Sequence, residues 1–335
     1  MSDTVKISVI MPMYNASASI ERCLAPLLAM LERGEVFEII VVDDCSTDDS
    51  PQKIANLPLR VLRTPEQSGP GGARNLASRD AKGDVLWFVD SDVIVSDDAA
   101  RQITVGFDED DVGAVFGSYD LNPEAVNFLS QYKNLVHRYY HQRGKLEAST
   151  FWAGCGAIRA DVFAEVGGYD AERYRYPSIE DIELGGRIVR SGRRILLVPG
   201  MQGTHLKEWR LVNLLHTEIF RRALPWSRLM LEHGEVTDDL NVGRGERVRA
   251  ALAGLFVLVA FAGLLGLLPW PYVLAATAVL VVANFDFLAF FARHRGVWFA
   301  AKAFCYHQLY YLYSGCVFCF AYAERLLFRK PAAQS

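Results

Sequence analysis

Short apolar runs alternate with helix-like segments over the first hundred residues. The runs are Lys6–Met11, Phe37–Val42, Leu59–Leu62 and Val85–Val89. Unbroken apolar runs of this length are typical of strands that are buried on both faces of a parallel sheet. The intervening segments repeat apolar residues at helical spacing, as in Ile20–Leu31. The pattern therefore predicts an α/β fold with helices on both faces of the sheet.

The alternation becomes irregular beyond Val95. Helices are expected at 97–107, 124–143 and 178–190, and strands at 112–119, 151–158 and 194–198. Together with the first hundred residues, these segments predict a Rossmann-like domain with a mostly parallel sheet over residues 1–235. Its last element is an amphipathic helix at about 208–223, whose arginines suit anionic lipid headgroups, although packing on the domain would also explain it.

The last third of the chain is more apolar than the rest. Ala250–Ala292 contains a single charged residue, Asp286, and Ala250–Leu268 contains none in 19 residues. As a helix this segment would be about 28 Å long, enough to cross the apolar core of a bilayer. Tyr272–Ala292 follows a turn rich in proline and is a second predicted transmembrane helix.

Basic residues at the outer ends of this predicted hairpin give its orientation. Arginines occur in the linker 236–249 and directly after the second helix, whereas the turn has none. By the positive-inside rule, the large domain is expected to face the cytoplasm. Val297–Phe320 could form a third transmembrane helix or lie in the interface, because it is long but contains several polar residues. The predicted membrane region is thus 250–325, with a tail at 326–335.

Composition excludes some classes of function. The formal net charge of −4 argues against a nucleic-acid-binding protein, which would present an excess of basic residues. The six cysteines show no disulfide framework, and no signal peptide is expected. We therefore expect a protein of the cytoplasmic membrane that is attached through its C-terminal segments.

Polar residues directly follow three of the predicted strands. Met13–Asn15, Asp43–Asp48 and Asp90–Asp92 all stand at strand ends. Ligands of parallel sheets bind beyond the carboxyl ends of the strands, so we expect these segments to share one crevice. Asp90 and Asp92 could hold a divalent cation that bridges to phosphates. Capping of a loop or helix is the simpler use of such a pair.

Other residues of the expected crevice suit a nucleotide. Tyr14 could stack on a nucleobase or anchor its loop, and Asp43 or Asp44 could accept a hydrogen bond from a base or ribose. In Ser68–Asn75 (SGPGGARN), glycines and a helix start precede Arg74, a combination that suits a diphosphate. This loop has neither the Walker nor the dinucleotide glycine spacing.

The motifs MPMYN, VVDDCSTDDS, GPGGARN and FVDSD, in this order, resemble those of the family 2 inverting glycosyltransferases of the GT-A fold. The resemblance continues through Phe151–Asp170, Ser178–Ile188 and Gly203–Trp209, and covers about Val5 to Trp209. It implies a GT-A domain that binds a nucleotide-diphosphate sugar, of UDP or GDP type, together with Mg²⁺ or Mn²⁺.

The resemblance also implies roles for individual residues. Asp90 and Asp92 match the metal-binding pair, and His205 matches a histidine that completes the metal site in many relatives, although a buried structural histidine is the alternative. The implied nucleotide-sugar contacts are Pro12, Tyr14, Asn15, Asp43, Asp44, Arg74 and Ser91. The implied walls of the sugar and acceptor pocket are Trp152, Gly154, Cys155 and Trp209.

Asp181, beside Glu180 at the start of a predicted helix, matches the catalytic general base of the family. The chemistry supports this role independently, because inversion at the anomeric carbon needs an acceptor hydroxyl that is deprotonated opposite the departing diphosphate. A neighbouring carboxylate such as Glu180 would raise the pKa of this base. The metal and Arg74 would stabilise charge on the leaving group. Helix capping is the other use of such an acidic pair.

The predicted function is a membrane-anchored, metal-dependent inverting glycosyltransferase whose acceptor is a lipid-linked glycan or a glycolipid. One alternative is a polyprenyl-phosphate sugar synthase, whose anionic acceptor needs no general base; the pair Glu180 and Asp181 argues against it. Further alternatives are a processive polymer synthase, a catalytically silent membrane scaffold and a nicotinamide dehydrogenase. The missing Gln-x-x-Arg-Trp sequence, the intact acidic motifs and the missing dinucleotide glycine spacing count against these in turn.

Overall fold

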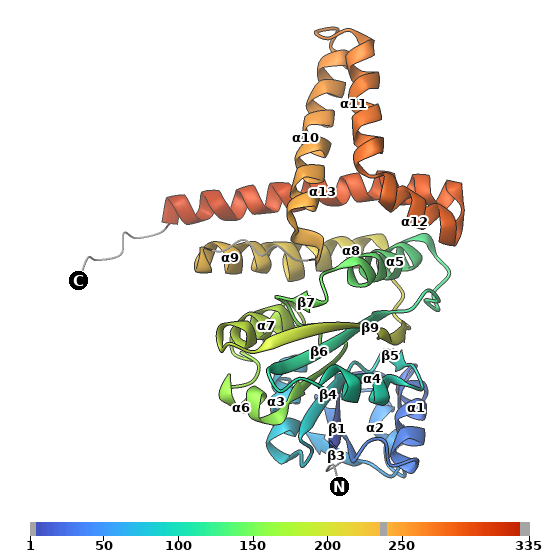
Figure 1. The fold of residues 1–335 in the computed structure, drawn as a ribbon, viewed down its shortest axis with the longest axis vertical. Coiled ribbons are helices and arrows are strands. Elements are labelled where there is room, and N and C mark those ends of the chain that lie inside the picture. Colours follow the sequence, from blue (N-terminus) through green and yellow to red (C-terminus); the bar gives the residue numbers. More distant parts are fainter. Residues whose placement is uncertain (1–4, 235–239, 329–335) are drawn as a thin grey trace, which may run out of the picture. The chain divides into compact units, whose positions relative to one another are not determined.

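The computed structural model describes residues 5–234 and 240–328 of the chain (Figure 1). The chain divides into two compact units, Met1–Arg210 and Leu211–Ser335. We expected the first domain to extend to residue 235 and to include the amphipathic helix at about 208–223. That helix instead belongs to the second unit, because it continues into the next helix and packs there on the C-terminal helix.

The first unit alternates strands and helices, as its apolar pattern predicts. Its strands are β1 (Ile7–Met13), β2 (Glu38–Asp43), β3 (Arg60–Arg63), β4 (Val85–Val89), β5 (Val93–Val95), β6 (Val112–Tyr119), β7 (Glu147–Ala148), β8 (Cys155–Arg159) and β9 (Arg194–His205). Its helices are α1 (Ile20–Glu32), α2 (Ser50–Ile54), α3 (Gly69–Asp80), α4 (Ala99–Gly106), α5 (Phe128–Arg143), α6 (Ala160–Glu165) and α7 (Glu180–Arg190). The first four expected strands fall within two residues of β1 to β4.

The strands form one sheet in the order β3-β2-β1-β4-β8-β6-β9-β5, with β7 paired to β9. Strands β1 to β4 are parallel, as expected. The expectation of a mostly parallel sheet is nevertheless wrong, because β8 runs antiparallel between β4 and β6, and β5 and β7 run antiparallel to β9. An apolar run predicts a strand but not its direction, which depends on how the chain enters the sheet.

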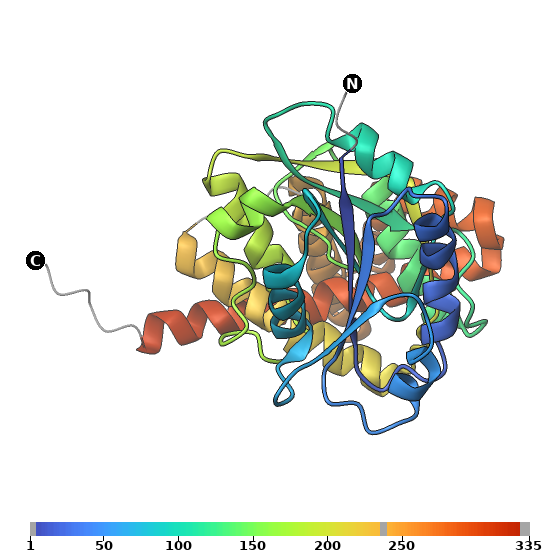
Figure 2. The same ribbon diagram turned by 90° about the horizontal axis from the view of Figure 1, so that it is seen from below.

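Side chains of successive strand residues enter two separate cores on opposite faces of the sheet. On β1, Val9 packs in a core with residues of α1 and α4, whereas Ile10 packs in the second core with residues of α3 and α7. Figure 2 shows α1 and α3 on opposite sides of β1. Each such side chain stabilises the fold by about 1.5–3 kcal/mol through burial. Packing on both faces of the sheet therefore fixes the position of β1. The residues at its carboxyl end can then contribute to the candidate site.

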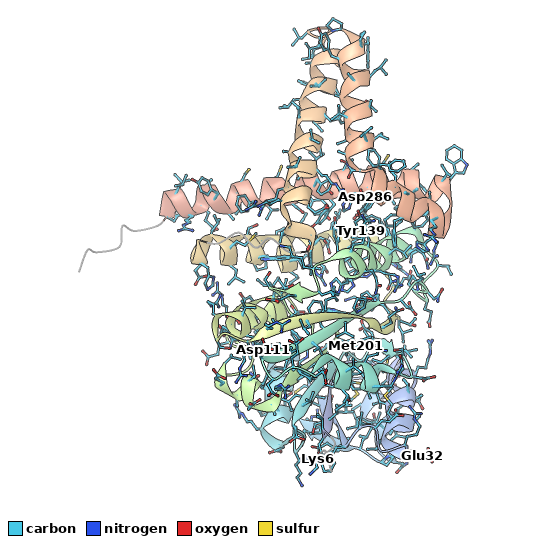
Figure 3. All side chains as sticks on the ribbon, viewed as in Figure 1. Lys6, Glu32, Asp111, Tyr139, Met201 and Asp286 are labelled. Atoms are coloured by element: carbon cyan, nitrogen blue, oxygen red, sulfur yellow. The ribbon has the colours of Figure 1, made fainter. Side chains whose placement is uncertain are left out.

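Strand β9 is longer than its apolar core predicts. We expected it to end at Val198, but it continues through Pro199 and Gly200 to His205. A bulge in its pairing with β6 lies near Gly117, where a Cβ atom would stand 1.9 Å from the carbonyl oxygen of Met201. Figure 3 shows Met201 on β9 within the domain. The extension brings the end of β9 beside β5, which would not have followed from composition.

The second unit is entirely helical in its described residues. Its elements are α8 (Leu211–His216), the π-helical segment η1 (Thr217–Ala223), α9 (Leu224–His233), the 3₁₀ turn η2 (Leu240–Val242), α10 (Arg244–Leu264), α11 (Trp270–Ala283), α12 (Phe285–Arg295) and α13 (Val297–Phe328). Within this unit, α10 and α11 form a hairpin, and α13 lies across the base of that hairpin and packs on α9, α10 and α12 (Figure 1).

The second predicted transmembrane helix is not continuous. The expected helix at 272–292 is divided at Asn284 into α11 and α12, which are bent by 66°. Arg249 of α10 holds this bend, since its guanidinium donates to the carbonyl oxygen of Ala283 at 2.9 Å and to Asp286 Oδ1 at 2.8 Å. Figure 3 labels Asp286 at the base of the hairpin. The apolar pattern predicts a continuous helix, but the chain bends where it makes these polar contacts with α10.

The boundaries at the two ends of the predicted membrane region also differ. Part of the expected linker 236–249 is helical from Arg244 onward, and its residues 236–239 lie outside the described residues. Among the described residues, α10 is long and apolar enough to cross a membrane, and α11 with α12 counts as a second candidate only if the bent pair is one span. Helix α13 is not among the helices that are apolar enough to cross a membrane. It extends to Phe328, into the expected tail.

Candidate active site

The three polar segments that follow β1, β2 and β4 are neighbours, as expected. Asn15 Oδ1 accepts hydrogen bonds from the amides of Thr47 and Asp48, at 2.8 and 3.3 Å. The carbonyl oxygen of Ser91 accepts from Ser19 Oγ at 2.7 Å, which joins the loop after β4 to the start of α1. These loops lie where the strand order turns back at β1, the usual position of a ligand site in such sheets.

The backbone of these loops is strained at two positions. Asn15 and Cys45 have φ angles of 49° and 63°, in the left-handed region. Asparagine tolerates this conformation, but for cysteine it costs on the order of 1 kcal/mol or more. Such strain persists only where the surroundings enforce it. Here Ser46 enforces it from both sides, since its Oγ accepts from the Asn15 amide and its own amide donates to Asp43 Oδ1.

The carboxylate of Asp44 holds the start of α3. Its Oδ1 accepts from Thr64 Oγ1 and the amide of Ser68, both at 2.8 Å, and its Oδ2 accepts from the amide of Gly69 at 2.9 Å. These bonds occupy the carboxylate that we expected to bind the base or ribose. Among the other expected nucleotide contacts, Pro12 is buried within β1 and Tyr14 is 47% exposed. Tyr14 is therefore the side chain of this group that a base could reach most directly.

Arg74 is buried instead of being exposed beside the strand ends. Its guanidinium is 2% exposed, bonds to Asp90 Oδ1 at 2.5 Å and lies 3.7 Å from Glu180 Oε1. It also faces the ring of Tyr169, with 5.3 Å from Cζ to the ring centroid. Since a buried guanidinium cannot touch a diphosphate directly, Arg74 would act on it through its charge and through Asp90.

Glu180 and Asp181 both stand at the start of α7 but have different surroundings. Glu180 is 6% exposed, and burial together with the negative charge of Asp181 raises its pKa to about 7, although Arg74 lowers it. Asp181 Oδ2 accepts from the amide of Ala153 at 3.3 Å. Asp181 also contributes to a raised pKa of Asp90, for which burial is the main cause. The acidic pair predicted from sequence thus lies beside the Asp90–Ser91–Asp92 segment.

Asp92 forms a pair with His205. The two are brought together because β5 pairs with β9, with Val93 opposite His205, and Nε2 of His205 lies 3.5 Å from Asp92 Oδ2. Burial raises the pKa of Asp92, but His205 and Lys207 lower it by more, so the net shift is downward. An ionised carboxylate beside an imidazole nitrogen is a pair of donors that Mn²⁺ accepts.

The geometry of this pair fits a divalent cation. Two neighbouring ligands of an octahedral ion, each about 2.1 Å from it, are separated by about 3 Å, close to the 3.5 Å between Asp92 and His205. In the part of the chain that the structure describes, no group of three or more His, Cys, Asp or Glu side chains is placed to hold a metal. The pair would therefore need further ligands from the diphosphate or water.

Of the four expected pocket residues, Trp152 is half-buried and the other three are buried. Gly154 is held close to Trp152 and accepts at its carbonyl oxygen from the Asp90 amide at 3.2 Å. Cys155 is completely buried in β8, where burial raises the pKa of its thiol to about 12. Trp209 is 4% exposed and lies under the ammonium group of Lys207. Cys155 and Trp209 hence support the pocket from the core instead of lining it.

Three residues near the site did not follow from the sequence. Tyr119 stacks on His205, His137 of α5 approaches Tyr119 with ring centroids 4.4 Å apart, and Lys207 contributes to the downward pKa shift of Asp92. Tyr119 stands at the end of a predicted strand, which is the one signal that could have indicated it. His137 lies on a helix whose orientation only the tertiary structure fixes.

Fold and site together define the first unit as a GT-A-like α/β domain with a mixed sheet, in which acidic residues follow the strand next to the switch point. Residues 8–167, slightly less than half of the chain, match the family described as "Glycosyl transferase family 2". The match ends before Glu180, Asp181 and His205. Their roles therefore rest on geometry and on the motifs in which they stand.

Two curated relatives are bacterial glycosyltransferases whose names refer to poly(ribitol-phosphate). The chain is 39% identical over 102 residues to the poly(ribitol-phosphate) beta-glucosyltransferase of Bacillus spizizenii, an alignment that covers 28% of this chain and 16% of the relative. It is 36% identical over 111 residues to the poly(ribitol-phosphate) beta-N-acetylglucosaminyltransferase TarS of Staphylococcus aureus, which covers 31% and 19% of the two chains. The aligned part is less than a fifth of either relative.

Solved structures share the fold. The structure of S. aureus TarS 1-349 in complex with UDP-GlcNAc has a TM-score of 0.51 at 20% identity, over 91% of this chain and 92% of that one. The mannosyltransferase PcManGT from Pyrobaculum calidifontis, in complex with GDP-Man and Mn²⁺, has a TM-score of 0.53 at 18% identity, over 98% and 89%. At these identities the likeness concerns the fold.

Proposed function

We propose that the chain is an inverting glycosyltransferase that moves a sugar from a nucleotide-diphosphate sugar to a hydroxyl group of a membrane-associated acceptor. The observation that carries this proposal is the arrangement of Asp90, Glu180 and Asp181 around the buried guanidinium of Arg74. It connects the strand-end acidic segment of the family 2 domain with a carboxylate pair placed for proton transfer.

Asp181 is the general base that we propose. Since burial raises the pKa of Glu180 to about 7, Glu180 holds a proton for much of the time near neutral pH. We assign proton transfer to Asp181, the other member of the pair, which accepts the proton of the acceptor hydroxyl as the new glycosidic bond forms. The long hydrogen bond from Ala153, at 3.3 Å, orients this carboxylate toward the Trp152–Gly154 segment.

Mg²⁺ or Mn²⁺ is the cofactor that we propose, held by Asp92 and His205. When bound, it would neutralise charge on the leaving diphosphate. Arg74 fixes Asp90 on the other side of the segment, so that Asp92 and not Asp90 is the carboxylate directed toward His205. The positive charge of the buried Arg74 would stabilise the negative charge that develops on the departing diphosphate.

The donor would be of UDP or GDP type. Support comes from the fold, which is shared with a protein in complex with UDP-GlcNAc and another in complex with GDP-Man. Tyr14, which is exposed in the loop after β1, would stack on the base. Asp44 would act by keeping the start of α3, and with it Arg74, in place.

The acceptor would be a lipid-linked glycan or a glycolipid at the cytoplasmic face of the cell membrane. Support comes from the α10–α11 hairpin. Only 11% of the most apolar 18-residue window of α10 is buried. Large exposed side chains there include Leu258 and Phe261, at 67% and 60%. Apolar surfaces of this extent are typical of membrane contact. The arginines at the hairpin's base favour the cytoplasmic orientation.

The test is donor hydrolysis and sugar transfer by the purified full chain in lipid, with a panel of UDP and GDP sugars and Mn²⁺. Wild type is compared with Asp92→Ala and Asp181→Asn, and with Asp97→Asn as a control at an exposed position outside the site. We expect Mn²⁺-dependent transfer that falls about 100-fold or more in Asp181→Asn, the usual cost of a lost general base. Asp97→Asn should match wild type.

Two results would contradict the proposal. Full transfer to polyprenyl phosphate by Asp181→Asn would favour the polyprenyl-phosphate sugar synthase, whose acceptor needs no base. Absence of binding for every nucleotide sugar would favour the catalytically silent scaffold.

A further inference from the structure

Tyr119 stands at the carboxyl end of β6 and touches the expected metal ligand His205 face to face. The ring centroids are 4.5 Å apart and the planes differ by 14°, so the two rings are stacked. The side chain is 9% exposed. The proposed reaction gives Tyr119 no role, since it is neither a base nor a ligand there.

The ring of Tyr119 is held on its other sides. Trp152 meets it at 4.8 Å with planes at 78°, and His137 of α5 approaches at 4.4 Å. An aromatic ring with neighbours on several sides has little freedom to rotate. The ring of Tyr119 can therefore act as a fixed surface on which the imidazole of His205 stacks.

The backbone of Tyr119 is fixed as well. Its carbonyl oxygen accepts from Arg138 Nη1 at 2.9 Å, and the next carbonyl, of Asp120, accepts from Asn134 Nδ2 at 2.9 Å. One turn further along α5, His141 Nδ1 bonds to the carbonyl oxygen of Gly117 at 2.9 Å. Helix α5 thus anchors the last residues of β6 through side chains on one of its faces, a framework independent of His205.

His205 has less support of its own. Its backbone is held by the pairing of β9 with β5, opposite Val93. The imidazole reaches Asp92 Oδ2 at 3.5 Å, which is longer than a hydrogen bond. The face of Tyr119 therefore restricts rotation of the imidazole about its side-chain bonds and helps to keep Nε2 directed toward Asp92.

We propose that Tyr119 is a positioning residue, which by stacking keeps the His205 imidazole in the orientation needed to bind a divalent cation together with Asp92. This inference rests on the proposed function, because it requires Asp92 and His205 to be the metal pair. Groups that orient a metal-binding histidine typically change metal affinity by about 10- to 100-fold when they are removed.

The experiment measures Mn²⁺ binding by the electron paramagnetic resonance signal of free Mn²⁺, with the full chain in lipid and a mixture of UDP and GDP present. The variants are Tyr119→Phe, Tyr119→Leu, His205→Gln and the double variant Tyr119→Leu/His205→Gln. We expect Tyr119→Phe, which keeps the ring, to bind as wild type does. Tyr119→Leu should bind about tenfold more weakly. The double variant should bind as His205→Gln does, because without the imidazole there is nothing left to orient.

The outcomes separate the two proposals. If His205→Gln binds Mn²⁺ as wild type does, the metal pair itself is wrong and the proposed cofactor site fails. If His205→Gln is weak but Tyr119→Leu binds normally, the metal pair stands and the role of Tyr119 is overturned. Equal losses in Tyr119→Phe and Tyr119→Leu, or additive losses in the double variant, also overturn it, since the effect would not act through the stacked ring.

A second measurement covers the case in which Tyr119→Leu does not fold. Nuclear magnetic resonance of histidine-labelled wild type, with the His205 signal assigned by its absence in His205→Gln, should show the upfield shift that a stacked aromatic ring causes. The shift should persist in Tyr119→Phe. A His205 signal at an unstacked position would overturn the inference.

Discussion

Adjacent carboxylates in this site have different partners. Glu180 is buried against Arg74, whereas Asp181 accepts from Ala153. In the same way Asp90 bonds to Arg74, whereas Asp92 lies beside His205. Carboxylates one or two positions apart in the chain thus contact different partners. At the residue scale, one member of each pair joins the buried guanidinium network, and the other is the member to which the proposed function assigns the chemistry.

The raised pKa of Glu180 makes a prediction for stability. Between pH 4.5, its ordinary pKa, and about 7, the folded protein holds a proton that the unfolded chain has lost. The free energy of unfolding therefore falls as the pH rises through this window, by about 3 kcal/mol at most from this group. Glu180→Gln should remove that dependence and be more stable than wild type near pH 8. Thermal midpoints of wild type and Glu180→Gln from pH 4 to about 8 measure this.

A useful comparison is Glu165→Gln at the end of α6, outside the site. It should keep the pH dependence of wild type. If the thermal midpoints of Glu180→Gln and wild type changed with pH in the same way, the pKa of Glu180 in the folded protein would not be raised, contrary to this prediction.

At the scale of elements, the start of α3 is fixed from outside the helix. The residue at its N-cap, Ser68, accepts no capping hydrogen bond from the helix. Instead Asp44, at the end of β2, accepts from the amides of Ser68 and Gly69. Gly69 has a φ of 74° and stands so near the carbonyl of Arg175 that a Cβ would be 2.2 Å from its oxygen. Two distant segments thus set the position of α3 and of Arg74 within it.

Removing this anchor should destabilise α3. Asp44→Ala leaves two amide donors without their acceptor, and we expect a loss of about 2–4 kcal/mol. Hydrogen exchange of α3 amides should accelerate in this variant while exchange in β1 changes less. Asp97→Ala, at an exposed position before α4, should stay within about 0.5 kcal/mol of wild type. Unchanged exchange in α3 would contradict the role given to Asp44.

At the scale of the whole molecule, the chain combines a domain with two buried cores and a helical unit with an exposed apolar hairpin. The cores of the first unit account for its stability in water. The second unit exposes Leu258, Leu264, Leu274 and Val282, at 67%, 72%, 67% and 73%. Since the described part of the chain leaves most of the surface of these side chains uncovered, a lipid environment would be their natural surroundings.

The hairpin makes a topological prediction. Helix α10 has 21 residues, about 31 Å, which matches the apolar thickness of a bilayer. Leu267, 72% exposed between α10 and α11, should therefore reach the far side of the membrane. In sealed vesicles of both orientations, Leu267→Cys should react with an impermeant thiol reagent only from the side opposite Arg244, above the background of the wild-type cysteines. Reaction from the side of Arg244 would indicate a re-entrant hairpin.

The ion-pair network at the hairpin's base makes another prediction. Arg249 bonds to Glu246 at 2.7 Å and to Asp286 at 2.8 Å, and it is partly buried. Arg249→Met leaves both carboxylates without this cation and should lower the stability of the second unit by about 1–3 kcal/mol. Arg293→Met, at an exposed position on α12, removes the same charge and should have little effect. Thermal unfolding in detergent compares them, and equal midpoints would contradict the prediction.

The sequence by itself determined the α/β class, the first four strands and the segments that meet at the carboxyl ends of those strands. Apolar runs and helical spacing are local patterns, and Val85–Val89 is β4 without any change of boundary. The carboxyl ends of parallel strands meet at one edge of the sheet, so Asn15 and Thr47 could be placed together without knowing any contact between them. The apolar composition of 250–292 likewise indicated the exposed hairpin.

Only the tertiary structure decided which side chains act together. The antiparallel direction of β8, the extension of β9 to His205 and the bend at Asn284 each depend on contacts between segments far apart in the chain. Those contacts in turn place Arg74 under Asp90 and Tyr119 on His205. Local sequence patterns indicate which side chains will be buried, but not which residues they will contact. The pairing of distant residues is fixed when whole elements pack, because only then do strand direction and register have a single solution.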